Sequence, residues 1–156
     1  LSLVNFKLKN FKLKQAAFIE AAGSVEITNA EFSDISSSAS SDAFIYQSCS
    51  ACGECSLKLE TIEIRYFNNG FEVRDDLVQS GLLKVEGAKQ VSLQGVKCQY
   101  GMLHSAIERP LMAFHDLKGP VKVYDSYIKY FAANSVLVLI DYSYSVQESI
   151  EVDSNG

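Results

Sequence analysis

The chain has 156 residues, a hydrophobic content of 47% and a formal net charge of −5. This length and apolar content suit one folded domain with a core and exclude wholesale disorder. The negative charge argues against a nucleic-acid-binding protein, which normally carries a basic patch. The longest apolar run covers only 136–140, whereas a membrane-spanning helix needs roughly 20 residues, so we expect neither nucleic acid nor membrane insertion.

Charged and apolar side chains alternate at the start of the chain. The charged positions are Lys7, Lys9, Lys12 and Lys14, and the apolar ones are Phe6, Leu8, Phe11 and Leu13. Alternation with a period of two is typical of a β-strand with one solvent-facing side. We interpret the lysines as the solvent face of a strand rather than a polyanion site.

Five segments share one spacing of apolar residues, at 0, +2, +5, +7 and +10 from the first. The segments start at Phe6, Val25, Leu57, Val91 and Val121, and their exceptions to apolarity are Gly101 and Ser126. Positions 0 and +2 lie on one face of a strand, and positions +5 and +7 lie on one face of a second strand. The step of three between them predicts a tight turn that lets both strands point inward, and turn-forming Asn, Asp and Gly occur there.

A second apolar block follows each segment and predicts a third strand. These blocks cover 17–19, 43–45, 82–85, 111–114 and 136–140, and the expected loops are 36–42, 46–56, 68–80, 102–110 and 141–149. Repeats of about 30 residues suit the coils of a solenoid. An antiparallel sandwich is the main rival, but it does not predict the same spacing five times.

The sequence therefore predicts an all-β fold, a right-handed parallel β-helix of about five coils that covers 1–156 as a single segment. A further coil begins near Ile150. Because the sequence starts within an apolar strand and stops within this new coil, we expect a segment of a longer chain. The expected partners are further coils of that chain or a self-assembly partner, with glycans as candidate ligands.

Four segments carry a resemblance to a known family of folds: SVEITNAEFSDI, SLKLETIEIRYFNN, QVSLQGVKCQYG and PVKVYDSYIKYFAAN. They resemble coils of the pectin-lyase-like right-handed β-helix, over nearly the whole chain. That superfamily includes polysaccharide lyases, glycoside hydrolases, phage tailspikes, adhesins and very large surface proteins, and the fold alone does not choose among them. The serine-rich stretch 36–41 and a small cysteine cluster most resemble large surface proteins of single-celled eukaryotes. The resemblance implies a non-catalytic structural or adhesive segment at the cell surface; the alternative is a carbohydrate-binding or polysaccharide-degrading domain.

The cysteine cluster consists of Cys49, Cys52 and Cys55 in a CxxCxxC spacing. We expect two of the three to form a disulfide that staples the loop, which implies an oxidising, extracellular compartment. The spacing does not fix which two pair. No fourth ligand lies nearby in sequence, so we expect no metal site. Cys98 falls at +7 and is expected to be a buried core thiol.

Candidate catalytic residues are few. His104 and His115 stand alone, without a nucleophile and an acid in a recognisable order. The acidic pair Asp75 and Asp76, beside Arg74, could act on sugars or hold calcium, but no second acidic pair stacks on an adjacent coil. We interpret this group as a solvated turn and expect no catalytic set and no cofactor.

The +9 position carries the most suggestive row of side chains. It gives Asp34, Tyr66, Tyr100 and Tyr130 on successive coils, with the polar row Ser33, Arg65, Gln99 and Lys129 beside it at +8. We expect the tyrosines to point outward and stack as a ladder. Exposed aromatic rows bind sugar rings or a partner surface, and they also simply cover a sheet. Tyr66, Tyr100 and Tyr130 are therefore the candidate binding residues.

Overall fold

The computed structural model describes residues 1–14, 16–37, 43–49, 54–68, 80–103, 109–133, 136–142 and 151–152. All the regular structure in these residues is β-strand. The strands are β1 (Ser2–Leu13), β2 (Ile19–Ala21), β3 (Val25–Ser37), β4 (Ala43–Ser48), β5 (Ser56–Phe67), β6 (Gly81–Glu86), β7 (Gln90–Leu103), β8 (Met112–Leu117), β9 (Val121–Tyr124), β10 (Tyr127–Ala133), β11 (Val138–Tyr142) and β12 (Glu151–Val152).

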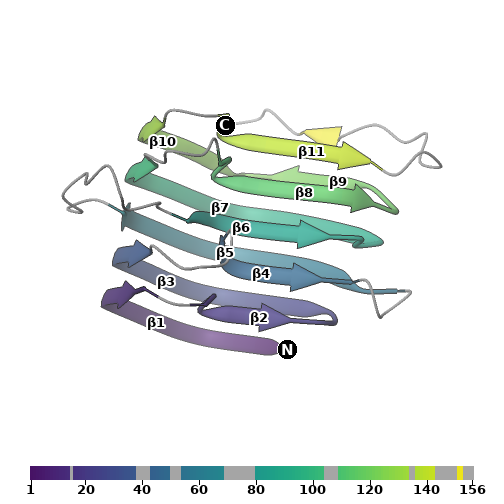
Figure 1. Ribbon diagram of the computed structural model, residues 1–156, viewed down its shortest axis with the longest axis horizontal. Helices are drawn as coiled ribbons and strands as arrows, with labels where there is room; N and C mark the ends of the chain where they lie inside the picture. The colour runs from purple at the N-terminus through teal and green to yellow at the C-terminus, as the bar shows by residue number, and fades with distance from the viewer. Residues whose placement is uncertain are drawn as a thin grey trace.

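The strands form two parallel sheets that the chain builds in alternation (Figure 1). One sheet has the order β1-β3-β5-β7-β9-β12, with β10 also pairing with β7, and the other has the order β11-β8-β6-β4-β2. Odd and even strands therefore lie in opposite sheets for most of the chain, and each strand pairs with the strand one coil away. This topology is a parallel β-solenoid, which confirms the predicted fold class.

The strand register follows the repeated apolar spacing. Val25 pairs with Leu57, Leu57 with Val91 and Val91 with Val121. The predicted start of the first coil at Phe6 is wrong, because Phe6 pairs with Ala30, the +5 residue of the next coil. The first coil thus starts at Leu1. The spacing fits two registers because a shift of five residues places +5, +7 and +10 on 0, +2 and +5.

Single residues in the left-handed region cause the three-residue steps in the pattern. Positive φ occurs at +4 and +9 in every coil, at Asn5, Asn10, Asn29, Asp34, Thr61, Tyr66, Gly95, Tyr100, Asp125 and Tyr130. Each such residue reverses the alternation of the strand once, so the side chains on both sides of the bend point into the core. In β1, β3, β5 and β7 the predicted pair of strands joined by a turn is therefore one long strand with two one-residue bends. Asn and Gly favour this conformation, which is why the first coil places Asn5 and Asn10 there.

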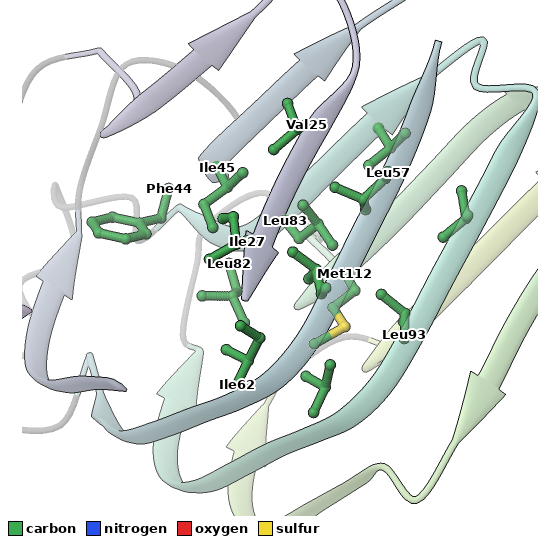
Figure 2. Packing of buried hydrophobic residues seen from close by; sticks show 14 of the residues in the cluster. Val25, Ile27, Phe44, Ile45, Leu57, Ile62, Leu82, Leu83, Leu93 and Met112 are labelled. Atoms are coloured by element: carbon green, nitrogen blue, oxygen red, sulfur yellow. The ribbon is translucent and has the colours of Figure 1, made fainter. Parts of the chain in front are cut away.

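The core lies between the two sheets and runs along the stack of coils (Figure 2). Inward residues of neighbouring coils lie above one another, as Ile27, Leu59 and Leu93 do, and all three are at most 5% exposed. An aromatic group fills the first coils: the ring of Phe44 stacks on that of Phe18 at a centroid distance of 5.0 Å. Cys98 is fully buried in this core, as predicted, and burial raises the pKa of its thiol to about 12.

The number of turns is about three rather than the predicted five. Among the coils whose burial the structure describes, those that begin at Val25, Leu57 and Val91 bury all five positions of the pattern. The first coil and the coil that begins at Val121 leave most of these side chains partly exposed. The apolar spacing repeats in every coil. The inward side chains of a coil are fully buried, however, only when another coil covers them on each side.

The two exceptions to the apolar pattern have local explanations. The ring of Phe131 occupies the space beside Gly101, where an added Cβ would lie 1.9 Å from ring atom Cε2. The hydroxyl of Ser126 accepts a hydrogen bond from the Val96 amide at 3.0 Å and donates one to the Tyr124 carbonyl at 2.8 Å. The pairing with β7 is interrupted at this point, and the strand is divided there into β9 and β10.

Candidate functional site

The predicted tyrosine ladder exists on the outer surface. Its tyrosines lie at the second bend of three successive coils, on β5, β7 and β10. The rings of Tyr66 and Tyr100 stack at 5.4 Å with an interplanar angle of 19°, and those of Tyr100 and Tyr130 stack at 5.1 Å with an angle of 8°. The three side chains are 40%, 42% and 70% exposed. They lie on adjacent strands (Figure 1) because β5 and β10 both pair with β7.

These tyrosines occupy backbone positions that suit other residues better. Their φ angles are 55° to 56°, in the left-handed region, which costs an L-residue about 1–2 kcal/mol. Asn10 and Asp34 hold the same bend in the first two coils with side chains that tolerate this region. Each stacked aromatic pair returns about 0.5–1.5 kcal/mol. Backbone preference alone therefore does not explain tyrosine at three successive bends.

The stacking decides which parts of the ladder a ligand can reach. The rings overlie one another, so the inner faces are covered by neighbouring rings and the ladder offers its ring edges and hydroxyl groups. Tyr130 is the most exposed of the three. A sugar ring binds best to an open aromatic face, so the ladder is a poor sugar platform except at its end.

A band of charged and polar side chains lies beside the ladder, on the strand segment between the two bends. Arg65 bonds to Glu63, Gln99 donates a hydrogen bond to the Tyr127 hydroxyl at 2.8 Å, and the Lys129 ammonium lies 4.5 Å from the centre of the Tyr127 ring. The ion pair with Glu63 raises the pKa of Arg65 above its ordinary value. The bond from Gln99 to Tyr127 joins neighbouring coils, whereas the other two contacts each lie within one strand.

A shallow polar groove follows the first bend, across the band from the ladder. Its volume is about 260 Å³, and the bend residues Asn5, Asn29, Thr61 and Gly95 line it together with the charged residues Lys7, Glu31, Glu63 and Lys97. The Asn29 amide donates to the Asn5 side-chain oxygen at 2.6 Å. A hydrogen bond from Lys7, 2.9 Å away, lowers the pKa of Glu31. The groove offers hydrogen bonds and charge to a polar ligand.

A second polar cluster lies on the outer face of the β4, β6 and β8 sheet. The Tyr46 hydroxyl donates to Glu86 at 2.7 Å, and the Lys84 ammonium lies 2.9 Å from the same carboxylate. Burial works to raise the pKa of Glu86, but the hydrogen bonds from Tyr46 and Lys84 outweigh it and leave that pKa below its ordinary value. His115 on β8 is the register partner of Glu86 on β6. The Glu86 carboxylate is therefore a neighbour of His115 from the adjacent strand, which the sequence did not indicate.

The structure gives a partial account of the other predicted residues. Cys49 and Cys55 are fully buried beside β4 and β5. Cys52, His104 and the Arg74–Asp76 group lie outside the described residues. The cysteine pairing and the interpretation of the acidic group as a solvated turn thus stay predictions.

Sequence reasoning missed a buried hydrogen-bond network at the end of β5. The side-chain oxygen of Asn68 accepts from the Ser37 amide at 2.7 Å, and its amide group donates to the Ser80 carbonyl at 3.3 Å. The Ser37 and Ser80 hydroxyls lie 2.5 Å apart. All three residues are fully buried. An Asn next to a run of β residues is the only signal in the sequence, and the expected loop 68–80 begins at this residue.

Within the described residues, no group of three or more His, Cys, Asp or Glu side chains is arranged to hold a metal ion. The same part of the chain contains no helix long and apolar enough to cross a membrane. No protein-family model matches the sequence, and the searches found no similar curated protein or solved structure.

Proposed function

We propose that this chain is a non-catalytic structural or adhesive segment of a large extracellular or cell-surface protein, built to be continued by further coils. The observation that carries the proposal is the open end of the solenoid at its last coil. There the columns of inward side chains, fully buried in the inner coils, reach Val123, Ile128 and Phe131, which are only partly buried.

The open end has the shape and chemistry of an unfinished core. An apolar cavity of about 210 Å³ lies there, lined by residues such as Val123, Ile128 and Ile140. Val138 beside it is 43% exposed. Exposed apolar surface of this kind favours burial under another layer. The layer that fits is one more coil with the same apolar spacing.

The strand pairing supports a coil rather than an unrelated partner. β12 pairs with β9 in parallel, with Val152 beside Val123. Glu151 lies beside Lys122, so the next rung begins in the register that the inner coils keep. At the other end, β1 carries three lysines, and lysine on an edge strand discourages unplanned strand pairing.

A coil graft tests this structural role. A copy of residues 57–90, one full repeat by the pairing of Leu57 with Val91, would replace residues 150–156. The matched control carries the same graft with its inward Leu57, Leu59, Ile62 and Ile64 copies changed to Ser. We expect the apolar graft to raise the urea midpoint and lower the binding of an apolar dye, relative to the control. Equal midpoints and equal dye binding for the two grafts would contradict the proposal.

The extracellular assignment rests on the cysteine cluster. A disulfide within Cys49, Cys52 and Cys55 would form and persist only in an oxidising compartment. Alkylation of the unfolded protein without reduction, followed by mass spectrometry, should leave two of these three cysteines unmodified because a disulfide joins them. Three alkylated thiols in the cluster would remove this support.

The alternative function is carbohydrate binding through the tyrosine ladder, which the exposure of Tyr130 favours. Under this alternative, changing Tyr66, Tyr100 and Tyr130 to Ala abolishes retention on a polysaccharide column. The covered inner faces of the ladder make the structural role the better supported of the two.

A further inference from the structure

The tyrosine ladder places three oxidisable rings in a fixed row. Tyr66, Tyr100 and Tyr130 lie on adjacent strands, at ring-centre distances of 5.4 and 5.1 Å, and all three are accessible to solvent. Neighbouring strands hold their backbones about 4.8 Å apart. Two other tyrosines differ in their surroundings, because the hydroxyl of Tyr46 donates to Glu86 and that of Tyr127 accepts from Gln99.

We propose that this ladder is a site of oxidative cross-linking, at which a peroxidase-type one-electron oxidant joins neighbouring tyrosine rings by a carbon–carbon bond. Each of two phenols loses one electron and its hydroxyl proton and becomes a phenoxyl radical. The two radicals combine at the carbons next to their oxygens. The hydrogen on each of these carbons then moves to the oxygen of the same ring, which restores both phenols. The pair has lost two electrons and two protons, which one hydrogen peroxide accepts to form two water molecules.

The geometry favours coupling within the ladder over coupling between molecules. A neighbouring ring on the next rung is always present, so the second step is intramolecular and does not depend on protein concentration. The bond requires the stacked rings to tilt until their edges meet. The side chains project outward at a bend and are 40% to 70% exposed. The rings therefore tilt through solvent rather than through packed protein. Tyr100 has a partner on each side and belongs to both possible links.

The product would be a covalent staple between successive coils. A link between Tyr66 and Tyr100 closes one full repeat, since β5 and β7 are neighbouring rungs. Cross-links that close long loops restrict the unfolded chain, so the coupled protein should need more urea to unfold. Such a staple suits a surface structural protein but does not require one.

The test uses the whole folded chain at micromolar concentration with a haem peroxidase and hydrogen peroxide. We expect dityrosine fluorescence in a product that still migrates as a monomer on a denaturing gel. Proteolysis and mass spectrometry should find the peptides of Tyr66 and Tyr100, or of Tyr100 and Tyr130, joined with the loss of two hydrogen atoms.

Two variants decide the outcome. Tyr100→Phe keeps the ring and its stacking but removes the phenol, and we expect it to lower the intramolecular yield at least fivefold. Tyr127→Phe is the matched control, because the partner of Tyr127 on the neighbouring strand is Lys97 rather than a tyrosine; its yield should equal that of the parent chain. Circular dichroism establishes that both variants fold. Equal yields from the parent and Tyr100→Phe, or product found only as cross-linked dimers, would overturn the proposal.

Discussion

Replacing Asn68 with Ala should destabilise the protein far more than the same change at Asn29. Both residues are asparagines with positive φ, 55° and 53° respectively, so both variants place alanine in the left-handed region at a cost of about 1–2 kcal/mol. Asn29 is exposed, and its side-chain bond to Asn5 is solvent-accessible. The change at Asn29 should therefore lower the free energy of unfolding by little more than the cost of placing alanine in the left-handed region.

Asn68 carries an additional cost because it is fully buried. Without its side chain, the Ser37 amide loses its partner in the interior, and the Ser80 carbonyl loses a donor. An unsatisfied buried polar group costs about 1–3 kcal/mol. The expected loss of unfolding free energy is then about 2–5 kcal/mol for Asn68→Ala, compared with about 1–2 kcal/mol for Asn29→Ala.

Urea unfolding followed by circular dichroism measures both changes. With a slope of about 1–3 kcal/mol per molar urea, the midpoint of Asn68→Ala should lie roughly 0.7 M or more below that of the parent chain. The slope should stay constant, because the surface exposed on unfolding is unchanged. Equal midpoints for the two variants would refute the reasoning, since they would show that the buried network contributes nothing beyond backbone conformation.

Four further outcomes follow from the structure. Gly95→Ala should cost about 1 kcal/mol of unfolding free energy, because φ is +63° while the space for a Cβ is adequate; an unchanged urea midpoint would contradict this. Phe44→Ala should cost about 3–5 kcal/mol, since the ring is fully buried among other aromatic rings; a loss below about 1 kcal/mol would show that this core collapses to fill the space. The Cys98 thiol should stay unreactive toward a thiol reagent at neutral pH until the chain unfolds, because its pKa is about 12; rapid labelling of the folded chain would disagree. Glu86 has a lowered pKa, so its contribution to stability is present above the ordinary value of 4.5 and is lost as pH falls through the lowered value; Glu86→Gln should flatten the acid limb of the stability curve, and an unchanged limb would count against this.

The repeated spacing was sufficient to predict the fold class. Apolar residues at 0, +2, +5, +7 and +10 determine which side chains turn inward, because each strand alternates sides and each step of three requires a bend. The same spacing predicted that Cys98 is buried and that Tyr66, Tyr100 and Tyr130 form an outer row, and the structure confirms both.

Only the tertiary structure decided the register of the first coil, the number of closed turns and the chemistry of the ladder. The pattern overlaps itself after a shift of five residues, so Phe6 fitted two positions until β1 paired with β3. Turn closure depends on neighbours above and below, and one coil's sequence does not describe its neighbours. The stacking of the tyrosine rings, the pairing of His115 with Glu86 and the buried bonds of Asn68 join residues from different coils. Such contacts arise from strand pairing at long sequence separation, which spacing along the chain does not encode.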